Sequence, residues 1–192
     1  MRSFALTLLL SAAAASPTLA QDDATAPFTG PRVEGLVGWD RVEANDDHDD
    51  AIGYGVGVGY DMQMGGAVVG VEAEYSDSDN RSCVGARTVA DPRICVKSGR
   101  DLYAGGRVGT LVTPSMLLYA KAGYTNAQAK LTSDDGTDQV TLDKTKLDGV
   151  RVGAGAEYAL GTNSFAKAEY RYSNYEQGVE RHQVMGGFGF RF

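Results

Sequence analysis

The last 11 residues of the chain read His182-Gln-Val-Met-Gly-Gly-Phe-Gly-Phe-Arg-Phe192. Apolar side chains alternate here with polar or small ones, which is the two-residue period of a β-strand with one apolar face. That face ends on Phe188, Phe190 and Phe192, which are costly to expose to water. A sheet that closes into a barrel and turns this face to lipid avoids both the exposure and an unpaired edge. The stretch therefore favours a membrane-spanning barrel strand, with the edge strand of a soluble sandwich as the alternative.

The first 20 residues predict export. A positive start at Arg2 is followed by mostly apolar residues 4–15 and by a small residue, Ala20. This is the pattern of a signal peptide, which is too short to remain as a transmembrane helix. We expect residues 1–20 to be removed, residues 21–30 to form a flexible periplasmic leader, and residues 31–192 to form the barrel.

Composition excludes several classes of protein. The 192 residues include 25 acidic and 18 basic side chains, a formal net charge of −7. Nucleic acid is an unlikely partner because no basic stripe is present to neutralise phosphates. No apolar run of about 18 residues follows residue 20, so a membrane could be crossed only by strands. The 25 glycines and 5 prolines favour a tightly packed sheet over a disordered chain.

Seven further segments share the alternation of the terminal stretch. The clearest is 52–62, where large apolar side chains alternate with glycines. Short connections at 63–66, 113–115 and 160–164 alternate with longer polar ones, as in bacterial outer-membrane barrels. We therefore predict an all-β fold, an eight-stranded antiparallel up-and-down transmembrane β-barrel. The other six strands are expected at 31–42, 67–75, 102–112, 118–124, 150–158 and 166–172, and the longer loops at 43–51, 76–99, 126–146 and 173–181.

Aromatic residues provide a separate check. If the strands run up and down in turn, the aromatics fall into two belts near the ends of the strands, at the heights where such rings prefer to lie in a membrane. A soluble sandwich has no reason to produce two belts. Near the outer ends are Trp39, Tyr54, Tyr75, Tyr124 and Tyr172, and near the periplasmic ends are Tyr60, Tyr158, Phe190 and Phe192.

Three motifs carry a family resemblance: Val150-Arg-Val-Gly-Ala-Gly-Ala-Glu-Tyr158, Ala166-Lys-Ala-Glu-Tyr-Arg-Tyr172 and Gly189-Phe-Arg-Phe192. With the signal peptide and the glycine-rich strands, they resemble the small outer-membrane β-barrel family that includes opacity-type surface proteins and the "porin family" of α-proteobacteria. The resemblance covers residues 31–192 and is strongest from 147 onward. It implies a surface-exposed protein of the outer membrane with both termini in the periplasm, and it carries over no catalytic residues.

The resemblance also implies partners. A terminal phenylalanine on the apolar face of the last strand resembles the signal by which the outer-membrane barrel assembly machinery recognises its substrates. The resemblance assigns that role to Phe188, Phe190 and Phe192. Outer-membrane lipid and lipopolysaccharide are the other expected partners, and the loops name no ligand. We expect no cofactor.

Charged residues in the opposite phase of the strands would point into the barrel. Eight strands enclose an interior that side chains can fill, so such charges must pair or meet trapped water. We favour an ion-paired plug over a narrow, gated cation path. The expected interior charges are the acids Glu34, Asp40, Asp61, Glu72, Glu74, Asp101, Glu157 and Glu169 and the bases Arg107, Lys121, Arg151, Lys167, Arg171 and Arg191.

Cys83 and Cys95 lie 12 positions apart in an exported chain, and we expect a disulfide in the longest outer loop. A metal site is disfavoured because neither cysteine belongs to a CxxC pair.

Other clusters give weaker signals. The acidic stretches 43–50 and 133–138 could hold a divalent cation but lack EF-hand spacing. The basic residues around the cysteines (Arg81, Arg87, Arg93, Lys97 and Arg100) could contact lipopolysaccharide, although acids are interleaved with them. His182 with Glu180 and Ser173 could be drawn as a catalytic set, but no nucleophile motif surrounds Ser173. We favour a structural or surface-interaction protein that is not an enzyme, with a small diffusion pore as the alternative and an enzyme acting on lipid A as the less favoured one.

Overall fold

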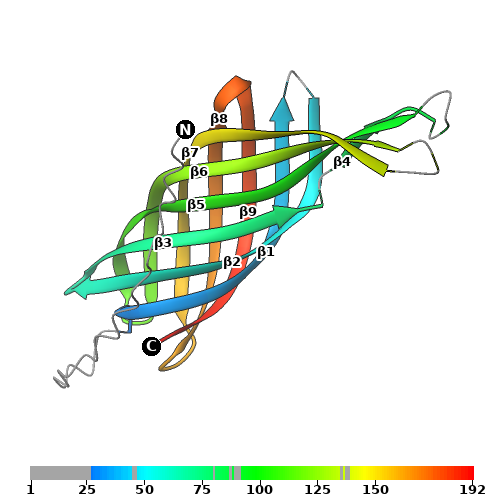
Figure 1. Cartoon of the computed structure of the whole chain (residues 1–192). Helices are drawn as coiled ribbons and strands as arrows, with labels where there is room; N and C mark the ends of the chain where they lie inside the picture. The colour runs from blue at the N-terminus through cyan, green and yellow to red at the C-terminus, as the bar shows by residue number, and fades with distance from the viewer. Residues whose placement is uncertain are drawn as a thin grey trace, which may run out of the picture.

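The computed structural model describes residues 27–44, 47–79, 81–86, 88, 92–134, 136 and 139–192. The predicted signal peptide and residues 21–26 of the leader lie outside this part of the chain. The described residues are mostly strand (Figure 1). The strands are β1 (Gly30–Ala44), β2 (Asp47–Met64), β3 (Ala67–Ser78), β4 (Arg81–Val84), β5 (Arg93–Thr113), β6 (Met116–Asp134), β7 (Gln139–Ala159), β8 (Ser164–Tyr175) and β9 (Val179–Arg191), with a 3-10 turn η1 (Glu176–Gly178) before β9.

The sheet closes on itself. Its order is β3-β2-β1-β9-β8-β7-β6-β5-β4, and an additional pairing of β3 with β5 joins the two sides. All of the pairings are antiparallel. Eight strands form the barrel, while β4 pairs with β5 outside the ring. The predicted eight-stranded antiparallel barrel is confirmed.

The first and last strands of the barrel pair along most of their length. Their register places Val33 opposite Phe190 and Gly35 opposite Phe188. The backbone N–H of Phe192 donates to the carbonyl of Pro31 at 2.9 Å. Because side chains alternate across a strand, the apolar side chains of β9 face outward and Met185 and Arg191 are buried inside.

The short connections lie where the sequence predicts them, at one end of the barrel. The longer loops were predicted wrongly, because strands occupy most of 76–99 and 126–146. Likewise, β1 runs to Ala44 and β2 begins at Asp47, so that connection is short. Parts of β4, β5, β6 and β7 extend past the barrel rim as a four-stranded sheet, visible at the right of Figure 1. We call this sheet the arm; it comprises residues 81–84, 93–98, 129–134 and 139–145.

An apolar cluster fills the barrel at the end with the short turns. It consists of Phe28, Val68, Leu117 and Tyr119, all buried. Phe28 belongs to the segment assigned to the leader, and its backbone N–H donates to Oε1 of Gln63 at 3.3 Å. This end of the barrel is therefore packed with side chains. In the described part of the chain, no helix is long and apolar enough to cross a membrane.

Candidate functional site

The interior of the barrel is lined by charged side chains. All 14 charges that the sequence places there are buried in the structure. Sequence reasoning missed two more, Arg32 and Arg181, which are also buried. Including these two arginines, eight acids and eight bases face the lumen among the described residues, so the interior carries no net formal charge.

At the end with the short turns, Asp61 lies among three arginines. Arg107 donates to both of its oxygens, at 2.8 and 2.6 Å, and Arg32 and Arg191 donate to Oδ2 at 3.0 and 2.9 Å. Glu157 completes the cluster by accepting from Arg107 at 2.9 Å and from Arg191 at 2.8 Å. These side chains are at most 5% exposed. Each buried guanidinium thus has carboxylate partners.

In the middle of the barrel, Lys121 holds three carboxylates. Its Nζ lies 2.8 Å from Glu72, 2.6 Å from Glu74 and 2.9 Å from Glu169. Lys167 joins Glu169 to Glu34, with the Glu34 contact at 2.7 Å. These contacts join strands that are two positions apart in the ring, and the pair of Arg171 on β8 with Glu74 on β3 spans opposite sides of the barrel, so the network crosses the lumen. Arg171 pairs with Glu74 and Glu169, and Arg32 pairs with Glu34 and Glu72, which joins this cluster to the one around Asp61.

Near the opposite end, Asp101 is the centre of the network. It accepts from Arg181 at 2.8 Å and from the hydroxyls of Thr125 and Tyr175 at 2.6 and 2.9 Å, and it pairs with Arg151. Arg181 also donates two hydrogen bonds to Asp40, at 2.8 and 2.6 Å. Arg151 lies 3.8 Å from Glu74 in the middle cluster, so one ion-pair network runs the length of the lumen.

Two buried tyrosines pack among these charges. The Nζ of Lys121 lies 4.6 Å from the ring centroid of Tyr103, and the guanidinium of Arg107 lies 4.9 Å from that of Tyr119. The Tyr119 hydroxyl donates to Glu169 at 2.5 Å. The rings occupy space between the ion pairs, and their faces attract the neighbouring cations. Together, these side chains give the lumen a packed, ion-paired interior.

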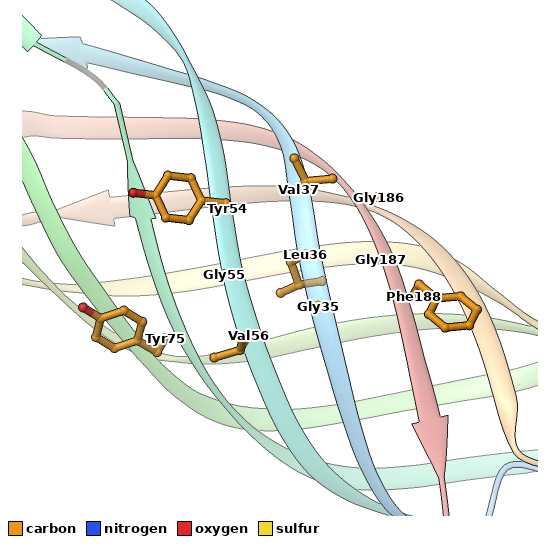
Figure 2. Close-up of a pocket in the computed structure, with 10 residues that line it drawn as sticks. All are labelled: Gly35, Leu36, Val37, Tyr54, Gly55, Val56, Tyr75, Gly186, Gly187 and Phe188. Atoms are coloured by element: carbon orange, nitrogen blue, oxygen red, sulfur yellow. The ribbon is translucent and has the colours of Figure 1, made fainter.

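The outer surface is apolar and aromatic. The belt residues, including Trp39, Tyr54, Tyr75, Tyr60 and Tyr158, have large exposed fractions. Outward-facing Gly35 lies in register between Phe188 and Val56. Because Gly35 has no side chain, it leaves a gap that contributes to an apolar groove of about 710 Å³ (Figure 2). The lining is that expected of a surface that faces acyl chains.

The catalytic set considered from the sequence, Ser173, Glu180 and His182, does not come together in the structure. Ser173 is buried in the lumen and accepts from Nε of Arg151 at 2.8 Å. His182 is the register partner of Tyr172, the neighbour of Ser173 in β8. Because successive side chains point to opposite faces of a strand, Tyr172 and His182 lie on the outward face. Its Nδ1 is 2.7 Å from the Tyr170 hydroxyl. Glu180, two residues before His182, lies on the same outward face, opposite Glu43 of β1.

The cysteines lie in the arm. Cys83 of β4 and Cys95 of β5 are direct register partners and form a disulfide. One register row of the arm runs Val84, Ile94, Ser133 and Val140, and its three apolar residues are exposed, Val84 by 78%.

The acidic stretches are described only in part. Asp134 in the second stretch is buried and accepts from the N–H of Gly136 at 2.9 Å. Residues 135, 137 and 138 of that stretch, Asn45 and Asp46 of the first stretch, and Arg87 near the cysteines lie outside the described residues.

Comparison with known proteins gives a family match. The family model described as "Outer membrane protein beta-barrel domain" matches residues 3–192. The chain is 32% identical over 162 residues to the 22 kDa outer membrane protein of Rhizobium leguminosarum bv. viciae, covering 77% of this chain and 70% of that protein. It is 29% identical to the 31 kDa outer-membrane immunogenic protein of Brucella melitensis, covering 72% of this chain and 65% of the relative, just under two thirds.

Solved structures agree with the fold. Ail, the attachment invasion locus protein of Yersinia pestis, superposes with a TM-score of 0.60 at 17% identity over 85% of this chain and 99% of Ail. Neisserial surface protein A gives a TM-score of 0.60 at 14% identity over 85% of this chain and 98% of that protein. At such identities the likeness concerns the fold alone.

Proposed function

Because this chain belongs to the outer membrane protein β-barrel family and is located in the outer membrane, we propose that it is a sealed surface protein, a barrel that holds the arm outside the cell and does not conduct solutes. The observation that carries this proposal is the ion-pair network across the lumen. Lys121 alone contacts carboxylates on two other strands, Glu72 and Glu74 on β3 and Glu169 on β8. A solute would have to break several such contacts at once.

The test is conductance. Purified, refolded protein in a planar bilayer is expected to give no stable current steps, while a general porin refolded in the same way serves as the positive control. An ohmic step that recurs with each insertion would overturn the sealed-barrel proposal and favour the small diffusion pore.

In the proposed orientation, the short turns and both termini face the periplasm and the arm faces outward, as in outer-membrane barrels generally. The arm supplies the contact surface because its row of exposed apolar residues lies beyond the barrel rim. We assign no catalytic role, since Ser173 and His182 belong to opposite faces of the wall. The proposed partners are lipopolysaccharide around the barrel and the assembly machinery at the terminal phenylalanines.

A further inference from the structure

Three side chains with metal-ligating atoms meet on the outward face of the barrel, beyond the row of Trp39 and Val184. They are Glu43 of β1 and Glu180 and His182 of β9, all half-buried, and one ligand atom from each lies within 4.8 Å of the other two. Glu43 and Glu180 are direct register partners. His182 is two residues from Glu180 and therefore shares its face. The donor set is mixed, with one imidazole and two carboxylates.

Glu43 and Glu180 place two carboxylates directly opposite each other on neighbouring strands. Like charges directly opposite one another on adjacent strands are destabilising. Arg41, which lies opposite His182, directs its guanidinium to Asp50 with hydrogen bonds of 2.8 and 3.1 Å. Among the side chains that the structure describes, which do not include that of His48, no basic group forms an ion pair with Glu43 or Glu180. A bound cation would neutralise this pair.

His182 is held in an orientation that suits a metal ligand. Tyr170 Oη lies 2.7 Å from its Nδ1, and the ring of Tyr172 lies 5.1 Å from the imidazole, centroid to centroid. Metal-bound histidines are typically fixed by a hydrogen bond through the ring nitrogen that does not bind the metal. In the tautomer whose Nδ1–H donates to Tyr170 Oη, the lone pair of Nε2 is available for an ion.

We propose that Glu43, Glu180 and His182 bind one divalent transition-metal ion of the Zn²⁺ type. Imidazole with carboxylates suits Zn²⁺, whereas Ca²⁺ and Mg²⁺ take oxygen ligands. The three protein ligands leave a fourth, tetrahedral position for water. The site joins β1 to β9, the first and last strands of the barrel, so the ion stabilises the seam where the barrel closes. This site is independent of whether the lumen conducts.

The experiment titrates Zn²⁺ alone into refolded, tag-free protein in detergent without lipopolysaccharide, using calorimetry. Co²⁺ is the spectroscopic probe, because a tetrahedral site gives it a distinct visible absorption. We expect about one ion per chain. The temperature at which the folded gel band converts to the unfolded one should rise with Zn²⁺, because an ion that binds the folded state stabilises it.

Matched variants decide the assignment. His182→Ala and Glu180→Gln should each weaken binding about tenfold or more and abolish the Zn²⁺-dependent rise in conversion temperature. Glu176→Gln, which alters an exposed acid in η1, should bind as wild type does. Absence of Zn²⁺ binding to the wild-type protein, or binding that survives both His182→Ala and Glu180→Gln, would overturn the proposal.

Discussion

Arg107 and Asp61 form a two-pronged ion pair inside the barrel, with Nε donating to Oδ1 at 2.8 Å and Nη2 to Oδ2 at 2.6 Å. This parallel geometry is the strongest that a guanidinium and a carboxylate form. The two residues belong to β5 and β2, and Gly70 of β3 lies in register between them. Because Gly70 has no side chain, Asp61 and Arg107 can meet across the intervening strand.

The first prediction concerns Asp61→Asn. Asp61 serves three buried arginines, and the neutral amide would leave one uncompensated positive charge in the lumen. Breaking a buried pair in this way costs about 3–5 kcal/mol. We expect a drop of that order in the free energy of unfolding, measured by urea titration of the folded gel band. Glu176→Gln at the exposed rim should unfold as wild type does, and equal behaviour of the two variants would show that the interior pairs do not stabilise the barrel.

The second prediction compares two glycines that face opposite sides of the wall. A Cβ at Gly70 would lie 2.8 Å from the carbonyl oxygen of Tyr60 and 3.1 Å from Cγ of Asp61, so Asp61 would have to move away. A Cβ at Gly35 would meet nothing within 4 Å. Gly70→Ala should therefore lower the free energy of unfolding by about 1–3 kcal/mol, as overpacking does. Gly35→Ala should leave it unchanged, and a reversed order would mean that the register of β3 is wrong.

The sequence predicted which residues of the barrel face inward, because membrane strands must alternate between lipid and lumen. It missed Arg181 for a specific reason: that residue fell in the loop expected at 173–181, whereas β9 begins at Val179. The pairing of Arg107 with Asp61 could not be predicted either. It depends on strand register and on the gap at Gly70, which a linear pattern does not contain.

The arm was missed because its strands lie beyond the barrel rim. Alternation of apolar and polar side chains is strict only where one face meets lipid. In the arm, threonine, serine, lysine and aspartate occupy strand positions of β6, so residues 129–134 have the composition of a loop. The same polar composition concealed the cluster of Glu43, Glu180 and His182. Glu43 and Glu180 were assigned to separate loops, and they meet because β1 pairs with β9.

The third prediction separates assembly in the cell from folding. Phe192 is 72% exposed on the outer face, so replacing it removes little packing within the barrel. If Phe192 is part of the assembly signal, Phe192→Ser should reduce the amount of protein in the outer membrane but leave refolding in detergent unchanged. Tyr158→Ser, an exposed outward aromatic that is not terminal, is the control for lost membrane contact. An equal loss of outer-membrane protein in both variants would remove the signal assignment.

The last prediction concerns the disulfide of the arm. Cys83 and Cys95 close a loop with a sequence separation of 12. By lowering the conformational entropy of the unfolded chain, the bond raises the free energy of the unfolded state by about 3 kcal/mol. The bond lies in the arm, whereas β3 pairs with β5 directly over Ala67–Ser76, so closure of the barrel does not need it. The double variant Cys83→Ser/Cys95→Ser should therefore reach the outer membrane and keep its heat-dependent gel shift, while protease cleaves the arm faster. Loss of the barrel in this variant would mean that the bond holds β3 against β5, and two free thiols in denatured, unreduced wild-type protein would show that the bond does not form.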